Sequence, residues 1–142
     1  MREVLIDSNA DWDVLWNSGE DVNVAKLSGA VQSQLASLNP HEAVIFAWGD
    51  SKFPALHKGN GRLQALANLK MDFMGVKPKN LEQRIAMALL ADTSIPFVSL
   101  NGAAGTGKTM SALAVTLHQI ANEEFDKLIF IKPVTPVGGK DI

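Results

Sequence analysis

The spacing of apolar residues divides the chain into a strand-rich first half and a second half in which strands and helices alternate. Two compact apolar runs, 4–6 and 43–48, predict strands, and the segments on either side of a glycine-rich stretch, 55–58 and 62–66, predict two more. The glycine-rich segment 59–61 predicts a hairpin turn between the last two. Apolar residues at helical spacing predict a short helix over 11–18 that ends at Gly19. We therefore expect a small β-rich domain of linker type over residues 1–72.

The pattern changes after Gly75. Pro78 disfavours helical backbone at the residue before it and marks a boundary, and Asn80 then opens a predicted helix. Beyond that helix, a strand over 96–100, a glycine-rich loop, a helix over 108–121 and a strand over 128–131 follow in order. This order predicts a βαβ unit with parallel strands and a right-handed crossover. The expected fold class is α/β, with the second domain over 73–142.

Composition excludes several classes of protein. The 142 residues are 46% hydrophobic and 20% charged and include no Cys, which argues against intrinsic disorder and excludes disulfides and thiolate metal sites. No apolar run approaches the roughly 18 residues of a membrane helix, and the first residues do not resemble a secretory signal. We expect a cytoplasmic protein without a membrane partner.

Charge is distributed unevenly along the chain. Residues 1–50 hold two basic and eight acidic side chains, whereas residues 52–84 hold seven basic and two acidic ones. The seven basic residues are Lys52, Lys58, Arg62, Lys70, Lys77, Lys79 and Arg84. Two interpretations stay open: an ordinary solvated surface, or a surface that contacts the phosphates of a nucleic acid.

The most specific motif is the segment 102–109, Gly-Ala-Ala-Gly-Thr-Gly-Lys-Thr, a full match to the G-x-x-x-x-G-K-[ST] pattern of phosphate loops. Its glycines allow successive backbone N–H groups to turn inward around a phosphate. The helix that follows directs the positive end of its dipole at the same point. Lys108 would reach the β- and γ-phosphates, and the Thr109 hydroxyl would be a ligand of Mg²⁺. The predicted cofactors are ATP and Mg²⁺.

A second motif is Asn80-Leu81-Glu82-Gln83. Asn80 as helix N-cap and Gln83 three residues later form a capping-box pattern. Alternatively, the paired donor and acceptor of the Gln83 amide read the edge of an adenine, and the two roles are compatible. The predicted nucleotide-binding residues are Asn80, Gln83, Gly102, Ala104, Gly105, Thr106, Gly107, Lys108 and Thr109.

Three segments together resemble the PhoH-like family of P-loop ATPases: 75–83, 101–109 and 132–138. The resemblance implies a RecA-like core of the helicase type and an intact parent that hydrolyses ATP and acts on RNA. It also implies that Gln83 belongs to an adenine-recognition motif. Lys132 stands where this family often has Arg, so a contact with phosphate or nucleic acid is implied there. Residues 1–72 resemble the small β linker that precedes the ATPase in longer relatives.

The parts that hydrolysis requires are not found in this chain. A P-loop ATPase needs a carboxylate after a further apolar strand, and the predicted strand 128–131 leads to Lys132 instead. We therefore identify no catalytic residue and expect a fragment of an ATPase core that binds ATP weakly without turnover. Whether the chain is an enzyme by itself is uncertain from sequence.

Two other functions compete with this interpretation. The chain could be a module that binds nucleic acid or a protein partner and keeps a vestigial nucleotide site, as the basic stretch suggests. It could also belong to another P-loop class such as a small kinase, although it lacks an Arg-rich lid. Single-stranded RNA and further copies of the chain are candidate partners. The cellular role, the preference for RNA or DNA and the oligomeric state do not follow from the sequence.

Overall fold

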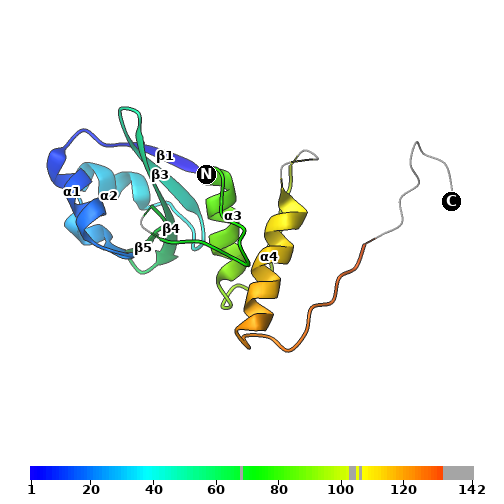
Figure 1. Ribbon diagram of the computed structural model, residues 1–142. Coiled ribbons are helices and arrows are strands. Elements are labelled where there is room, and N and C mark those ends of the chain that lie inside the picture. Colours follow the sequence, from blue (N-terminus) through cyan, green and yellow to red (C-terminus); the bar gives the residue numbers. More distant parts are fainter. Residues whose placement is uncertain (68, 103–104, 106, 133–142) are drawn as a thin grey trace.

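A computed structural model of the chain describes residues 1–67, 69–102, 105 and 107–132. It contains a five-stranded sheet with helices on both faces (Figure 1). The strands are β1 (Arg2–Leu5), β2 (Asp21–Asn23), β3 (Ala43–Trp48), β4 (Ser51–Gly59) and β5 (Arg62–Ala65). The helices are α1 (Asn9–Asn17), the 3₁₀ helix η1 (Val24–Lys26), α2 (Gly29–Leu35), α3 (Leu81–Ala91) and α4 (Lys108–Ala121).

The sheet is mixed, with the strand order β1-β3-β4-β5-β2. β1 and β3 pair in parallel, and the other neighbours pair antiparallel. A tight turn at Gly49-Asp50 joins β3 to β4, in register from Ala43↔Leu56 to Trp48↔Ser51. The turn between β4 and β5 has Asn60 and Gly61 at φ +55° and +70°, the left-handed region that two-residue hairpin turns require.

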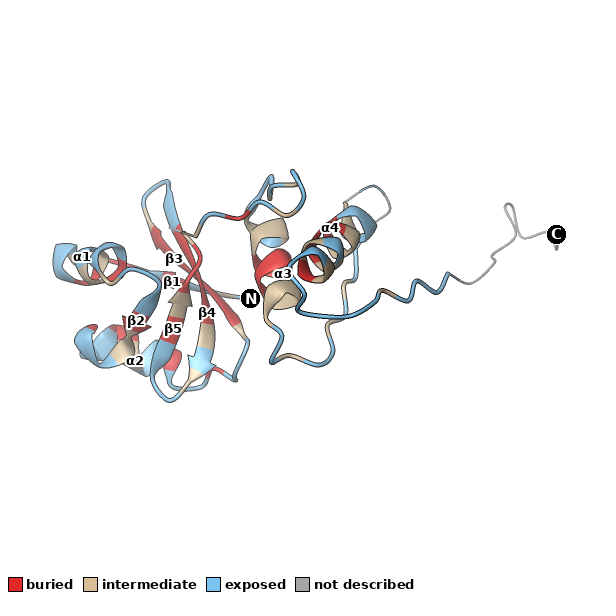
Figure 2. Ribbon diagram, turned by 60° about the horizontal axis from the view of Figure 1, so that its bottom comes forward, coloured by how far each residue is buried: buried red, intermediate tan, exposed pale blue. Residues whose placement is uncertain are grey.

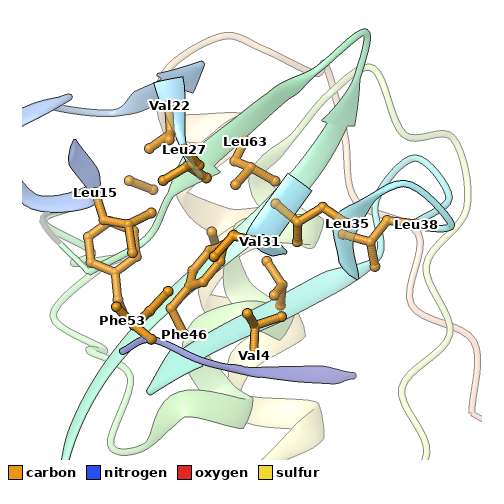
Figure 3. Close-up of a cluster of buried hydrophobic side chains, with 14 residues drawn as sticks. Val4, Leu15, Val22, Leu27, Val31, Leu35, Leu38, Phe46, Phe53 and Leu63 are labelled. Carbon is orange, nitrogen blue, oxygen red and sulfur yellow. The ribbon is translucent and has the colours of Figure 1, made fainter. Parts of the chain in front are cut away.

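One face of the sheet packs against α1 and α2 (Figure 3). Leu15 of α1 and Val31 of α2 join Phe46 and Phe53 of the sheet in a core of fully or nearly fully buried side chains. The buried Asp11 carboxylate accepts hydrogen bonds from the Ser28 backbone N–H and hydroxyl, both at 2.7 Å. Because Ser28 is the N-cap of α2, this carboxylate joins α1 to the start of α2.

An aromatic cluster lies on the same side of the sheet. The ring centroids of Trp12 and Trp16 lie 6.0 Å apart, and those of Trp12 and Trp48 lie 5.9 Å apart. Phe53 extends the cluster, with its centroid 5.0 Å from that of Trp16. The edge-on and tilted arrangements are those that aromatic rings prefer.

The other face of the sheet packs against α3, and α4 packs on α3 (Figure 2). Apolar residues of this second core come from both sides of the boundary expected at residue 72: Ala43, Ile45, Leu56, Leu66, Met71, Ile85, Met87, Ala88 and Val115. Two polar contacts of α3 fasten it there. The Arg84 guanidinium donates to the carbonyls of Leu66 and Leu69 at 3.2 and 2.9 Å, and Asp92 after the helix pairs with Lys58 of β4 at 2.7 Å.

Most predicted elements are confirmed. The strands over 4–6, 43–48, 55–58 and 62–66 correspond to β1, β3, β4 and β5, and the predicted helices correspond to α1, α3 and α4. The two-domain division stays a prediction. The short strand β2 and the helix α2 were not predicted. β2 has three residues and one apolar side chain, Val22, whereas Val31 and Leu35 of α2 do have helical spacing and this signal was missed.

The predicted βαβ unit is wrong for the described residues. Residues 96–100 and 128–131 are not strands, and the parallel pair that the described part contains is β1–β3. Phe97 and Ile131 are 81% and 84% exposed. A strand is stable only when a neighbour satisfies its backbone hydrogen bonds and its apolar side chains are covered, and neither condition holds at these two segments.

No helix in the described residues is long and apolar enough to cross a bilayer.

Substitution Asp11→Ala removes the acceptor of two Ser28 donors in a partly buried position. We expect a loss of about 1.5–3 kcal/mol in the free energy of unfolding, the usual contribution of hydrogen bonds to a charged group. Urea titration followed by far-UV circular dichroism measures it. Asp13→Ala, on the exposed side of the same helix, is the matched control and should have little effect. Equal losses in both variants would contradict the role assigned to Asp11.

The Lys58–Asp92 pair should make stability depend on pH. Hydrogen bonds from Lys58 and then from Ser94 lower the pKa of Asp92 from 3.8 to about 2. A lowered carboxyl pKa stabilises the fold above pH 3.8, and this contribution is lost as the pH falls toward 2. Asp92→Asn should therefore cost no more than about 1 kcal/mol at pH 7, because the pair is partly exposed. The difference from the wild type, measured by urea titration at several pH values, should shrink as the pH falls below 3.8 and vanish below pH 2.

Candidate phosphate-binding site

The helices α3 and α4 run in the same direction, and their N-terminal ends lie together (Figure 1). At that end, the Gln83 amide nitrogen lies 3.3 Å from the position that a Cβ on Gly107 would occupy. At the other end, the buried Gln119 side chain donates to the carbonyls of Leu90 and Ala91, at 3.1 and 3.4 Å. The second motif and the glycine-rich loop are thus brought side by side.

A pocket of about 580 Å³ lies at these helix N-termini. Six of the nine predicted nucleotide-binding residues line it: Asn80, Gln83, Gly102, Gly105, Gly107 and Lys108. Two more, Ala104 and Thr106, lie outside the described residues. The ninth, Thr109, lines an adjacent pocket of about 370 Å³, to which Lys108 also contributes.

Two glycines of the loop adopt conformations that other residues disfavour. Gly105 and Gly107 both have φ +82°, and Gly107 is the N-cap of α4. A side chain at Gly107 would be strained by its backbone and would crowd the Gln83 amide. Glycine at this position therefore permits both the left-handed cap and the approach of α3.

The capping interpretation of the second motif is confirmed for Asn80, whereas the return bond of Gln83 goes to the residue before the cap. The Asn80 side-chain oxygen accepts from the Gln83 backbone N–H at 2.9 Å, and the Gln83 side-chain oxygen accepts from the Lys79 backbone N–H at 2.8 Å. The capping residue thus fixes the first turn of α3, and the reciprocal bond fixes the orientation of the Gln83 side chain. As a consequence, the amide nitrogen of Gln83 is directed toward the loop.

The cation of the loop is held within the site. The Lys108 ammonium donates to the carbonyl of Gly102, which is the first residue of the loop motif. Lys79, at the start of α3, also lines the pocket. Two Lys side chains and two helix N-termini outweigh the one carboxylate among the described lining residues, that of Glu82, and give this end of the pocket a positive character that suits an anion.

Other expectations concern residues away from this pocket. Lys132 is exposed and lines neither pocket.

Sequence reasoning also missed lining residues: Met1, Lys79, Glu82 and Ser111. Helical spacing could have indicated Ser111, which lies one turn after Gly107. Met1 has no such local signal, because its place at the pocket is set by the position of the neighbouring strand β1 in the sheet.

The basic stretch is largely engaged in structural contacts. Lys52 pairs with Glu3 at 3.3 Å, Lys58 with Asp92, and Arg62 with Asp21 at 3.7 Å. The Arg84 guanidinium is bonded to backbone carbonyls, as described above. Four of the seven basic side chains thus have partners within the fold, which supports the interpretation of an ordinary surface for this stretch.

A metal site made by protein side chains alone does not occur in the described part of the chain, which has no group of three or more His, Asp or Glu residues able to hold an ion. Thr109, the last residue of the loop motif, carries a hydroxyl that could hold a metal ion together with oxygen atoms of a bound ligand.

Comparison with known proteins agrees with the motifs. The family model described as PhoH-like protein matches residues 75–142. Protein PhoH2 of Bacillus subtilis (strain 168) is 48% identical over 69 residues, covering 48% of this chain and 15% of that protein. Protein PhoH2 of Mycolicibacterium smegmatis is 30% identical over 132 residues, covering 88% of this chain and 29% of that protein. No solved structure matches the chain significantly.

The similarity to the mycobacterial relative extends well beyond the segment that the family model matches, and thus into the strand-rich first half. The chain spans less than a third of the length of either of these relatives. The loop motif, the Asn80–Gln83 motif and the comparisons all agree: the chain belongs to the PhoH-like family over residues 75–142.

Proposed function

We propose that the pocket between the N-terminal ends of α3 and α4 binds ATP with Mg²⁺. The observation that supports this most directly is the convergence of Gln83, Gly107 and Lys108 on one pocket. The volume of about 580 Å³ is in the range of ligand pockets that hold small molecules. Family membership supports a P-loop ATPase-like protein.

The phosphates occupy the α4 end in this proposal. Lys108 exchanges its bond with the Gly102 carbonyl for the β- and γ-phosphates, and the backbone N–H groups at the start of α4 face the same anion. A hydroxyl is an oxygen donor of the kind that Mg²⁺ prefers, and Thr109, which lines the adjacent pocket together with Lys108, supplies one. The Thr109 hydroxyl at the second position of α4 would hold the ion together with phosphate oxygens, and the ion would neutralise phosphate charge.

The base is read by the Gln83 amide. Its nitrogen donates to a ring nitrogen of adenine, and its oxygen accepts from the exocyclic amino group. In the structure that oxygen accepts from the Lys79 N–H. When the base binds, the oxygen either accepts from both the Lys79 N–H and the adenine amino group or gives up its bond to Lys79.

For the whole protein we propose ATP hydrolysis coupled to work on RNA, in a homo-oligomer. Support for this wider activity comes from the family resemblance. By itself, the chain described here is proposed to bind ATP without turnover, because no catalytic carboxylate was identified in its sequence.

Substitution Lys108→Ala should weaken binding of Mg-ATP at least about tenfold, because charge-assisted hydrogen bonds to phosphate are lost. Isothermal titration calorimetry measures the affinity directly. Lys127→Ala, an exposed charge that lines neither pocket, is the matched control. The proposal fails if the wild type does not bind Mg-ATP or if both variants bind it equally well.

Substitution Gln83→Glu separates capping from base recognition. The carboxylate still accepts from the Lys79 N–H and suits a helix N-terminus, so the melting temperature should be maintained. The variant has no amide donor, so the preference for ATP over GTP should fall by about tenfold. Competition between the two nucleotides measures this ratio. An unchanged ratio would leave Gln83 with a capping role alone.

A further inference from the structure

Glu82 lies on the wall of the nucleotide pocket, next to Gln83 in the sequence. It shares one face of α3 with Ala86 and Leu89, which are four and seven residues further on and also line the pocket. This face presents one carboxylate at the start of an otherwise apolar wall. Glu82 is exposed, and no described residue forms a hydrogen bond or ion pair with its side chain.

The charge of Glu82 restricts what it can contact in a bound nucleotide. Lys108 and the start of α4 define the phosphate end, and a carboxylate would repel phosphate oxygens there. A carboxylate only accepts hydrogen bonds, so its partner must be a donor. The hydroxyl groups of a ribose are uncharged donors, and carboxylates hold ribose hydroxyls at other nucleotide sites.

The neighbouring position of Gln83 supports the same assignment. Successive helical residues project in directions about 100° apart, so the two side chains can serve adjacent parts of one ligand. In a nucleotide, the sugar lies between the phosphates and the base. In this proposal Gln83 contacts the base and Lys108 contacts the phosphates. The sugar is therefore the part of the ligand that faces the rest of α3, where Glu82 lies.

We infer that Glu82 accepts hydrogen bonds from the ribose hydroxyls and makes the pocket selective for ribonucleotides over 2′-deoxyribonucleotides. This inference rests on the proposed function. Glu82 also lies in the first turn of α3, where a negative charge stabilises a helix. The experiment must separate these two roles.

The test compares Mg-ATP with Mg-2′-deoxy-ATP by isothermal titration calorimetry. The wild type should bind Mg-ATP about tenfold more tightly, as expected for a hydrogen bond to a charged acceptor. In Glu82→Ala the ratio should fall to about one. Glu82→Asp keeps the charge and suits a helix N-terminus but is shorter, so the melting temperature should be maintained while the ratio still falls. Glu124→Gln, beyond the far end of α4, should leave the ratio unchanged.

Three outcomes would overturn the inference. If the wild type binds both nucleotides equally, the proposed function stands and the sugar contact is refuted. If Glu82→Ala tightens both nucleotides by the same factor, Glu82 acts only through charge repulsion. If Glu82→Ala lowers the melting temperature and keeps the ratio, its role is confined to the helix. Absence of any nucleotide binding would overturn the proposed function as well.

Discussion

The burial of β3 on both faces is the constraint on which the rest of the structure depends. Its first five residues are all buried, so neither face of this strand can be left to solvent. Parallel pairing with β1 and antiparallel pairing with β4 satisfy its backbone, and helices must cover it above and below. α1 and α2 cover one face, and α3 with α4 covers the other.

The geometry of the pocket follows from this requirement. Because Ile85 and Ala88 of α3 belong to one buried cluster with Ala43 and Ile45 of β3, and α3 also contacts β4, the sheet fixes where α3 lies. α4 is then placed by its contact with α3, including the bonds from Gln119 to the end of that helix. The loop before α4 therefore meets the start of α3, and the strand-rich first half supports a site whose motifs all lie in the second half.

Local sequence signals were sufficient to predict most helices and strands and the two motifs that meet at the pocket. The apolar run 43–48 coincides with β3, and Asn80 caps α3 as its pattern predicts. Gly105 and Gly107 of the loop motif have positive φ values, which glycine adopts more readily than other residues. The segments 96–100 and 128–131 have the composition of strands but no partner strand in the described residues. Strand formation depends on pairing with other parts of a sheet, and local composition does not report on that pairing. Likewise, neither the arrival of Met1 at the pocket nor the shared second core could be predicted, since both arise from tertiary packing.

The position of the aromatic cluster has an optical consequence. The chain has three Trp residues and no Tyr, and all three Trp lie together on the α1 side of the sheet. The pocket lies on the opposite side, beyond α3, and has no aromatic residue in its lining. Intrinsic fluorescence of this protein therefore reports on one face of the sheet alone. Any change in emission on adding a nucleotide would have to be transmitted through the sheet itself.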